Sequence, residues 1–129
     1  MPSDTPPVAR ERRDYYRINV SLPICLQPET DTVEGQCTEK SVNLSAGGIG
    51  LVVNHPYQAN EILSCTLLLP DLAPFKSSVE VLRVDPIHYP PGTYRLHARF
   101  VRLTRENREL LVRYILQFQR EHLAKHYSV

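Results

Sequence analysis

Two short motifs contain the residues of this chain best suited to bind an anionic ligand. In chain order they are Arg12-Arg13-x-x-x-Arg17 and, 26 residues past its end, Asn43-x-Ser45-x-x-Gly48. Arginine presents a planar fork of donors, which forms bidentate, charge-assisted hydrogen bonds with phosphates and with the O6/N7 edge of guanine. Asparagine and serine add short side chains that both donate and accept hydrogen bonds. These residue types favour recognition of a ligand.

The two motifs differ in how often chance would produce them. With twelve arginines in the chain, an R-x-x-x-R match is expected about once at random, and Arg95 with Arg99 supplies another. A match to N/D-x-S-x-x-G is expected only about 0.02 times. Alone, the second motif is also explained by a glycine-rich hairpin turn in which Asn43 and Ser45 bond their own backbone. The signal is the two motifs together, in this order.

Composition restricts the class of protein. The chain has 129 residues, enough for one domain, and a net charge of +1, which argues against binding long nucleic acids by bulk electrostatics. Its three cysteines are odd in number and form no C-x-x-C pair, so neither a disulfide framework nor a zinc site is expected. A polar, proline-rich start and short apolar runs predict a cytoplasmic protein with no signal peptide and no membrane insertion.

Short strands separated by turn signals must position the motifs. Residues 1–9 are expected to be a flexible arm, and residues 10–129 a single domain whose barrel covers about 17–103. Hydrophobic residues alternate from Ile18 to Leu26, which predicts a half-buried first strand. Five more strands are expected at Glu34–Leu44, Ile49–Val53, Ile62–Leu69, Phe75–Val84 and Tyr94–Leu103. This pattern predicts an all-β barrel or sandwich, with the second motif in a turn.

The last quarter of the chain predicts a helix over about 104–125. No Gly or Pro follows Thr104, which suits an N-cap. One helical face gathers five large apolar residues, namely Leu110, Leu111, Tyr114, Ile115 and Phe118. That face is expected to pack on the barrel. A thinner stripe of Val112, Leu116 and Leu123 is either ordinary partial exposure or a surface for a homodimer or a partner protein.

With these elements in place, the sequence resembles the PilZ family. The family's hallmark is R-x-x-x-R followed by D/N-x-S-x-x-G on a six-stranded antiparallel β-barrel with a C-terminal α-helix, and the likeness runs from about Arg10 to about Phe118. It implies a receptor for cyclic di-GMP without catalytic residues, cofactor or metal. By position, Arg13 and Arg17 would clamp the ligand. Asn43 stands where Asp is commoner. The second wall would comprise Asn43, Ser45 and Gly48.

The resemblance leaves the binding mode open. Arg12 completes the longer R-R-x-x-x-R form, which in the family is associated with binding two ligand molecules. If residues 13 and 17 are extended, their Cα atoms lie about 13 Å apart and suit a dinucleotide-sized ligand; in a helical turn they converge on one group. Gly47 and Gly48 are expected to allow positive φ and close approach to the ligand. Binding would order residues 1–17 and so change the surface that a protein partner meets.

Other functions are less well supported by the sequence. His122 and His126 have the spacing of two metal ligands on a helix but lack a recognised third ligand. Tyr15 and Tyr16 could stack on single-stranded nucleic acid, against which the near-neutral charge argues. Arg83 could also reach the nucleotide, but it is equally explained by solubility. The main alternative is a PilZ-like module that acts without nucleotide in pilus, flagellar or secretion machinery.

Overall fold

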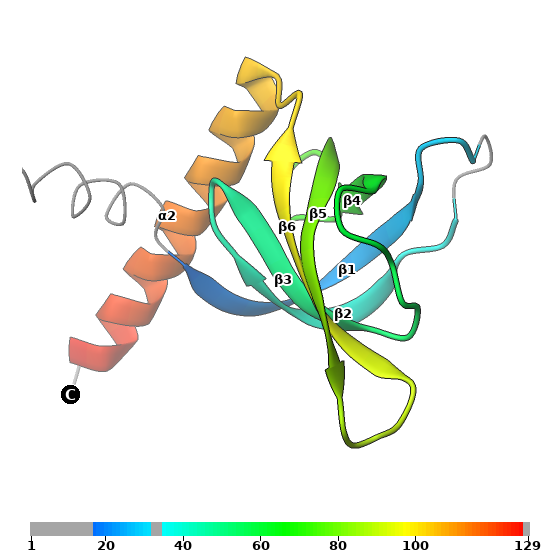
Figure 1. Ribbon diagram of the computed structural model, residues 1–129. Helices are drawn as coiled ribbons and strands as arrows, with labels where there is room; N and C mark the ends of the chain where they lie inside the picture. The colour runs from blue at the N-terminus through cyan, green and yellow to red at the C-terminus, as the bar shows by residue number, and fades with distance from the viewer. Residues whose placement is uncertain (1–16, 32–34, 128–129) are drawn as a thin grey trace, which may run out of the picture.

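The computed structural model describes residues 17–31 and 35–127, and side chains as far as His122. Arg12, Arg13 and the expected arm at 1–9 therefore lie outside the described residues. Six antiparallel strands close into a barrel in the order β1-β2-β3-β6-β5-β4, followed by one helix (Figure 1). The strands are β1 (Ile18–Pro28), β2 (Thr38–Leu44), β3 (Gly48–Val53), β4 (Ile62–Leu67), β5 (Phe75–Ile87) and β6 (Thr93–Val101). The prediction of a six-stranded barrel is confirmed.

Strand β1 shows the expected alternation. Ile18, Leu22 and Ile24 are buried, and their neighbours Asn19 and Ser21 are exposed. Together with alternate residues of the other five strands, they fill the barrel interior, because successive side chains of a strand point to opposite faces. The interior includes fully buried leucines from four strands, namely Leu22, Leu44, Leu63 and Leu96.

Strand β1 tolerates Pro23, which has no backbone N–H to donate, because of where Pro23 lies relative to β4. Its carbonyl accepts a hydrogen bond from the Leu68 amide at 3.1 Å, just past the last β4 residue paired with β1, Leu67. In an antiparallel strand the nitrogen and oxygen of one residue face the same neighbour. The missing N–H of Pro23 therefore faces the end of β4 and removes no bond from the ladder.

Most predicted strand boundaries lie within two residues of those observed, and two differ by three or more. Strand β2 begins at Thr38, later than the expected Glu34, which lies outside the described residues. Strand β5 continues through Pro86 to Ile87, whereas Asp85-Pro86 was expected to end it. Beyond Val81 only β6 pairs with β5, so its other edge is open, and proline is tolerated on a sheet edge.

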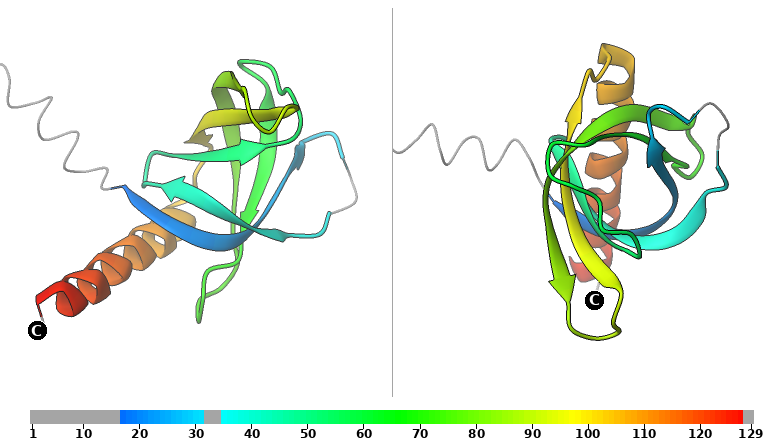
Figure 2. Two further views of the ribbon diagram at one scale, coloured as in Figure 1. Left: turned by 90° about the horizontal axis from the view of Figure 1, so that it is seen from below. Right: turned by 45° about the vertical axis from the view of Figure 1, so that its right-hand side comes forward.

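Helix α2 (Arg105–Tyr127) lies beside the barrel, and its C-terminal part extends beyond it (Figure 2). Thr104 is the N-cap, because its Oγ1 accepts a hydrogen bond from the Asn107 amide at 3.1 Å. The predicted apolar face packs into the core: Leu111, Tyr114 and Ile115 are buried, and Leu110 and Phe118 are partly buried against it.

The cysteines carry no disulfide in the part of the chain that the structure describes. Cys25 and Cys65 are buried, and Cys37 is half-buried at the approach to β2. Burial raises the pKa of the Cys65 thiol to about 12, because a thiolate would lack solvation in the barrel interior. Cys65 is therefore a core residue with an unreactive thiol.

Candidate functional site

The second motif spans the end of β2, the tight turn at residues 45–47 and the start of β3. The Ser45 amide donates to the Gly48 carbonyl at 3.0 Å, and the Ser45 Oγ accepts from the amides of Gly47 and Gly48, each at 3.2 Å. Ser45 is only 2% exposed. Its hydroxyl therefore holds the turn in shape, and direct contact between Ser45 and a ligand stays a prediction.

Gly48 is required by the approach of two strands. A Cβ at this position would lie 2.4 Å from the backbone oxygen of Ala98 on β6, which no real contact allows. The Phe100 amide also donates to the Gly47 carbonyl at 3.0 Å, so the turn is bonded directly to β6. The expectation of positive φ at Gly47 and Gly48 is wrong, since Gly92 is the one described glycine with that conformation.

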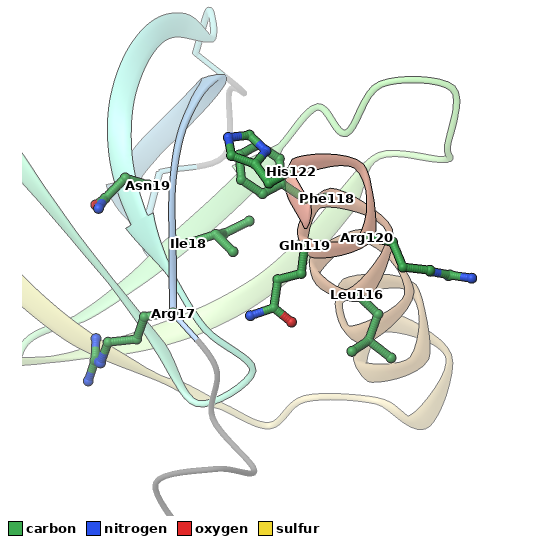
Figure 3. Close-up of a pocket in the computed structure, with 8 residues that line it drawn as sticks. All are labelled: Arg17, Ile18, Asn19, Leu116, Phe118, Gln119, Arg120 and His122. Carbon is green, nitrogen blue, oxygen red and sulfur yellow. The ribbon is translucent and has the colours of Figure 1, made fainter. Parts of the chain in front are cut away.

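The two motifs meet through side chains. Arg17 Nη1 donates to Asn43 Oδ1 at 2.8 Å, and Asn43 Nδ2 donates to Asn19 Oδ1 at 3.0 Å. Strand pairing brings them together, because Asn43 lies opposite Asn19 in the β1–β2 register. Arg17 and Asn19 extend from one side of β1, whereas Ile18 points to α2 (Figure 3). The amide oxygen thus orients the arginine without neutralising its charge.

A cleft of about 350 Å³ opens beside this contact. Its lining includes Arg17 and the turn at Ser45 and Gly48, together with residues of β5 and β6 on the opposite side. The lining residues from β5 and β6 are Leu82, Arg83, His97, Ala98 and Arg99. Three arginines therefore surround one small cleft, Arg17 just before β1, Arg83 from β5 and Arg99 from β6. An anion is the ligand that such a cleft favours.

Two glycines of β3, Gly48 and Gly50, place no side chain on their side of the cleft. Gly48 pairs with Arg99 and Gly50 with His97 in the β3–β6 register. Unlike Gly48, Gly50 has room for a Cβ, whose nearest contacts would be His97 Nδ1 and the Leu96 carbonyl oxygen, each at 3.7 Å. Packing therefore does not dictate glycine at position 50. Its effect is to leave free the space beside His97 that a side chain would occupy.

Arg83 and His97 form a hydrogen-bonded group on one side of the cleft. Arg83 Nε donates to Asp85 Oδ2 at 2.9 Å, and Arg83 Nη2 lies 3.4 Å from His97 Nε2. Because a guanidinium has no acceptor, this His97 nitrogen must accept. Partial burial, and then the positive charge of Arg83, lower the pKa of His97 below 6.5. His97 is therefore neutral at pH 7.

Arg99 is paired with an acid on the neighbouring strand. Its Nη2 lies 2.6 Å from Glu80 Oε1, and Glu80 is opposite Arg99 in the β5–β6 register. The three arginines of the cleft face two carboxylates, Glu80 and Asp85, which leaves one positive charge in excess among the described residues. All three guanidiniums are held by hydrogen bonds before a ligand arrives.

Sequence reasoning placed one side of this cleft and missed most of the other. The predicted site does not include Arg83, His97 or Arg99, and Arg99 enters the sequence analysis only within a chance R-x-x-x-R match. Alternation along β6 puts residues 95, 97 and 99 on one face. Their place opposite the turn, however, depends on the β3–β6 register and on the irregularity between Val81 and Arg83, where Leu82 is 53% exposed.

The described residues contain neither a membrane-spanning helix nor a cluster of metal ligands. Within 17–31 and 35–127, no helix combines the length and apolar character needed to cross a bilayer. Over the same ranges, no three His, Cys, Asp or Glu side chains cluster in a way that could hold a metal ion. His122 stacks on Phe118, with ring centroids 4.1 Å apart.

The described residues thus form a closed six-stranded barrel with a packed C-terminal helix and an arginine-lined cleft. The chain belongs to the PilZ domain family, which matches residues 11–117. The flagellar brake protein YcgR of Methylotenera mobilis is 28% identical to this chain, in an alignment that covers 96% of this chain and 54% of the relative. This chain therefore spans about half the length of that relative.

Solved structures share the fold. The Bacillus subtilis inhibitor of motility (MotI/DgrA) is 22% identical with a TM-score of 0.68, over 85% of this chain and 52% of the other. Escherichia coli YcgR in complex with c-di-GMP is 21% identical with a TM-score of 0.68, over 89% and 49%. A tetrameric PilZ domain from Xanthomonas campestris is 14% identical with a TM-score of 0.70, over 91% and 97%.

Proposed function

We propose that this protein is a cyclic di-GMP receptor that regulates a protein partner and is not an enzyme. The observation that carries the proposal is the contact between Arg17 and Asn43, which joins the two motifs at the mouth of a cleft lined by two further arginines. Family membership and the c-di-GMP complex of Escherichia coli YcgR support this choice of ligand. The relative's name, flagellar brake protein, supports a role in motility.

In the proposed site, each group has a role that matches its chemistry. Arg17, Arg83 and Arg99 form charge-assisted hydrogen bonds with phosphate oxygens or the guanine O6/N7 edge. Asn43 orients Arg17, and Gly50 leaves room for the base. We further propose that the ligand neutralises Arg12 and Arg13, which lie outside the described residues, and so fixes the segment that precedes Arg17. That ordering is the proposed signal to the partner.

Calorimetric titration with cyclic di-GMP tests the proposal, with GTP and cyclic di-AMP as competing ligands. Arg17→Ala and Arg13→Ala should each weaken binding about 10- to 100-fold, because each loses charge-assisted bonds of about 1.5–3 kcal/mol. Asn43→Ala should weaken it about fivefold, since a neutral bond of about 1 kcal/mol is lost. Arg95→Ala is the matched control, because it alters the other R-x-x-x-R match outside the cleft.

The controls distinguish a receptor for cyclic di-GMP from a domain that acts on its partner without nucleotide. If Arg95→Ala weakens binding as much as Arg17→Ala, the ligand is held by general charge and the assigned site is wrong. If the native protein takes up no cyclic di-GMP and its melting temperature does not shift at saturating ligand, the receptor function fails. The domain would then act on its partner without nucleotide.

A further inference from the structure

The outer face of α2 gathers arginines around a small apolar centre. At about 100° per residue, seven residues fall within an arc of about 140° opposite the buried face. They are Arg105, Arg108, Glu109, Val112, Arg113, Leu116 and Arg120, and they line a shallow groove of about 570 Å³. Leu116 is 43% exposed and Val112 is half-buried. We call this surface the α2 arginine face.

The four guanidiniums of this face are exposed and have no acidic partner within the described part of the chain. Glu109 is the one acid among the seven residues, and it forms no ion pair with them. In Figure 3 the Arg120 side chain extends from α2 on the side away from β1. The face therefore presents an uncompensated charge of about +3 around Leu116.

We propose that the α2 arginine face docks an acidic, amphipathic segment of a partner protein. Carboxylates of the partner pair with the arginines, and an apolar side chain occupies the groove at Val112 and Leu116. A second copy of this chain fits poorly, because two-fold packing would bring eight guanidiniums together. A membrane surface fits poorly too, since only two apolar residues are present and Glu109 repels lipid phosphates.

This inference deepens the proposed function by naming the surface through which the receptor meets its partner. The regulatory consequence of docking rests on the proposed function, whereas the docking itself does not. The cleft and the α2 arginine face share no residue. Arg17 of the cleft does line a further pocket together with Leu116 and Arg120 of this face (Figure 3). Ligand binding and docking are therefore measured in separate assays, one with cyclic di-GMP and one with a peptide.

Fluorescence anisotropy with a labelled synthetic helical peptide tests the proposal. The peptide carries two leucines one turn apart, flanked by glutamates. One control peptide has serine for leucine at equal charge, and another has glutamine for glutamate. Both controls should bind at least about tenfold more weakly, because the face offers both charge and an apolar groove. Arg113→Glu and Leu116→Ser should each weaken binding of the first peptide, the former by about tenfold.

Arg95→Glu is the matched control, because it makes the same charge change on an exposed residue of β6. Arg113→Glu should leave the calorimetric titration with cyclic di-GMP unchanged. The proposal is overturned if Arg95→Glu and Arg113→Glu weaken peptide binding equally. It is also overturned if the serine peptide binds as well as the leucine peptide, if vesicles containing anionic phosphatidylglycerol compete for the face, or if Arg113→Glu dissociates a homodimer seen by sedimentation.

Discussion

The arginines of the cleft and those of α2 differ in how they are held. In the cleft, Arg17, Arg83 and Arg99 each donate to a neighbouring side chain. On the outer face of α2, the four arginines have no such bonds among the described residues. Groups fixed in advance lose little entropy when a small rigid ligand binds, whereas unpaired side chains can adapt to a larger surface. The same residue type thus suits two different kinds of recognition.

The largest expected effect separates the two faces of α2. Leu111→Ala should lower the free energy of unfolding by about 2–5 kcal/mol, because Leu111 is fully buried and a cavity would remain. Leu116→Ala should change it by less than about 0.5 kcal/mol, since Leu116 lies on the exposed face. Urea denaturation measures both. A similar loss of unfolding free energy in the two variants would mean that Leu116 packs against the barrel. The two faces of α2 would then not differ in the way described.

A smaller effect separates the two glycines beside the cleft. Gly48→Ala should destabilise the protein by about 1–3 kcal/mol, because its Cβ would collide with the Ala98 oxygen and push β3 from β6. Gly50→Ala should leave stability within about 0.5 kcal/mol but weaken cyclic di-GMP binding. Thermal melts and calorimetry on both variants measure this. Full ligand affinity in Gly50→Ala would remove Gly50 from the proposed site.

The smallest effect concerns the titration of His97. Its pKa in the folded protein lies below 6.5, because of burial and the nearby Arg83. As the pH falls through 6.5, His97 takes up a proton in the unfolded chain before it does so in the folded protein. The free energy of unfolding therefore decreases until the pH has passed the lower pKa of the folded protein. Above 6.5 this contribution to stability is fully present. His97→Gln should flatten the slope relative to the native protein, and parallel slopes in urea denaturation would contradict it.

The sequence predicted those parts of the molecule that depend on local pattern. Alternation in β1, the Thr104 cap and the buried face of α2 each depend on residues close together in the chain. The position of the second motif in a turn was predictable for the same reason. The start of β2 and the continuation of β5 past Pro86 were missed, because pairing with a neighbouring strand decides where a strand stops.

The candidate site was less accessible to sequence reasoning. The sequence offered the bonding of Ser45 to its own backbone only as an alternative to ligand binding. The close approach of Gly48 to β6 is a long-range contact that neither motif specifies. Arg99 and His97 enter the cleft through long-range register. Arg12 and Arg13 lie outside the described residues, so their part in binding stays a prediction.

The direct passage from β6 into α2 has a mechanical consequence. β6 carries His97 and Arg99 in the cleft, ends at Val101, and is followed by the helix from Arg105. With 23 residues, α2 is about 34 Å long at 1.5 Å per residue. A tilt of about 3° at its base would move its far end by about 1.8 Å. Because only residues 102–104 separate β6 from α2, any tilt of the helix that followed a displacement of β6 would be largest at the end of the helix far from the cleft.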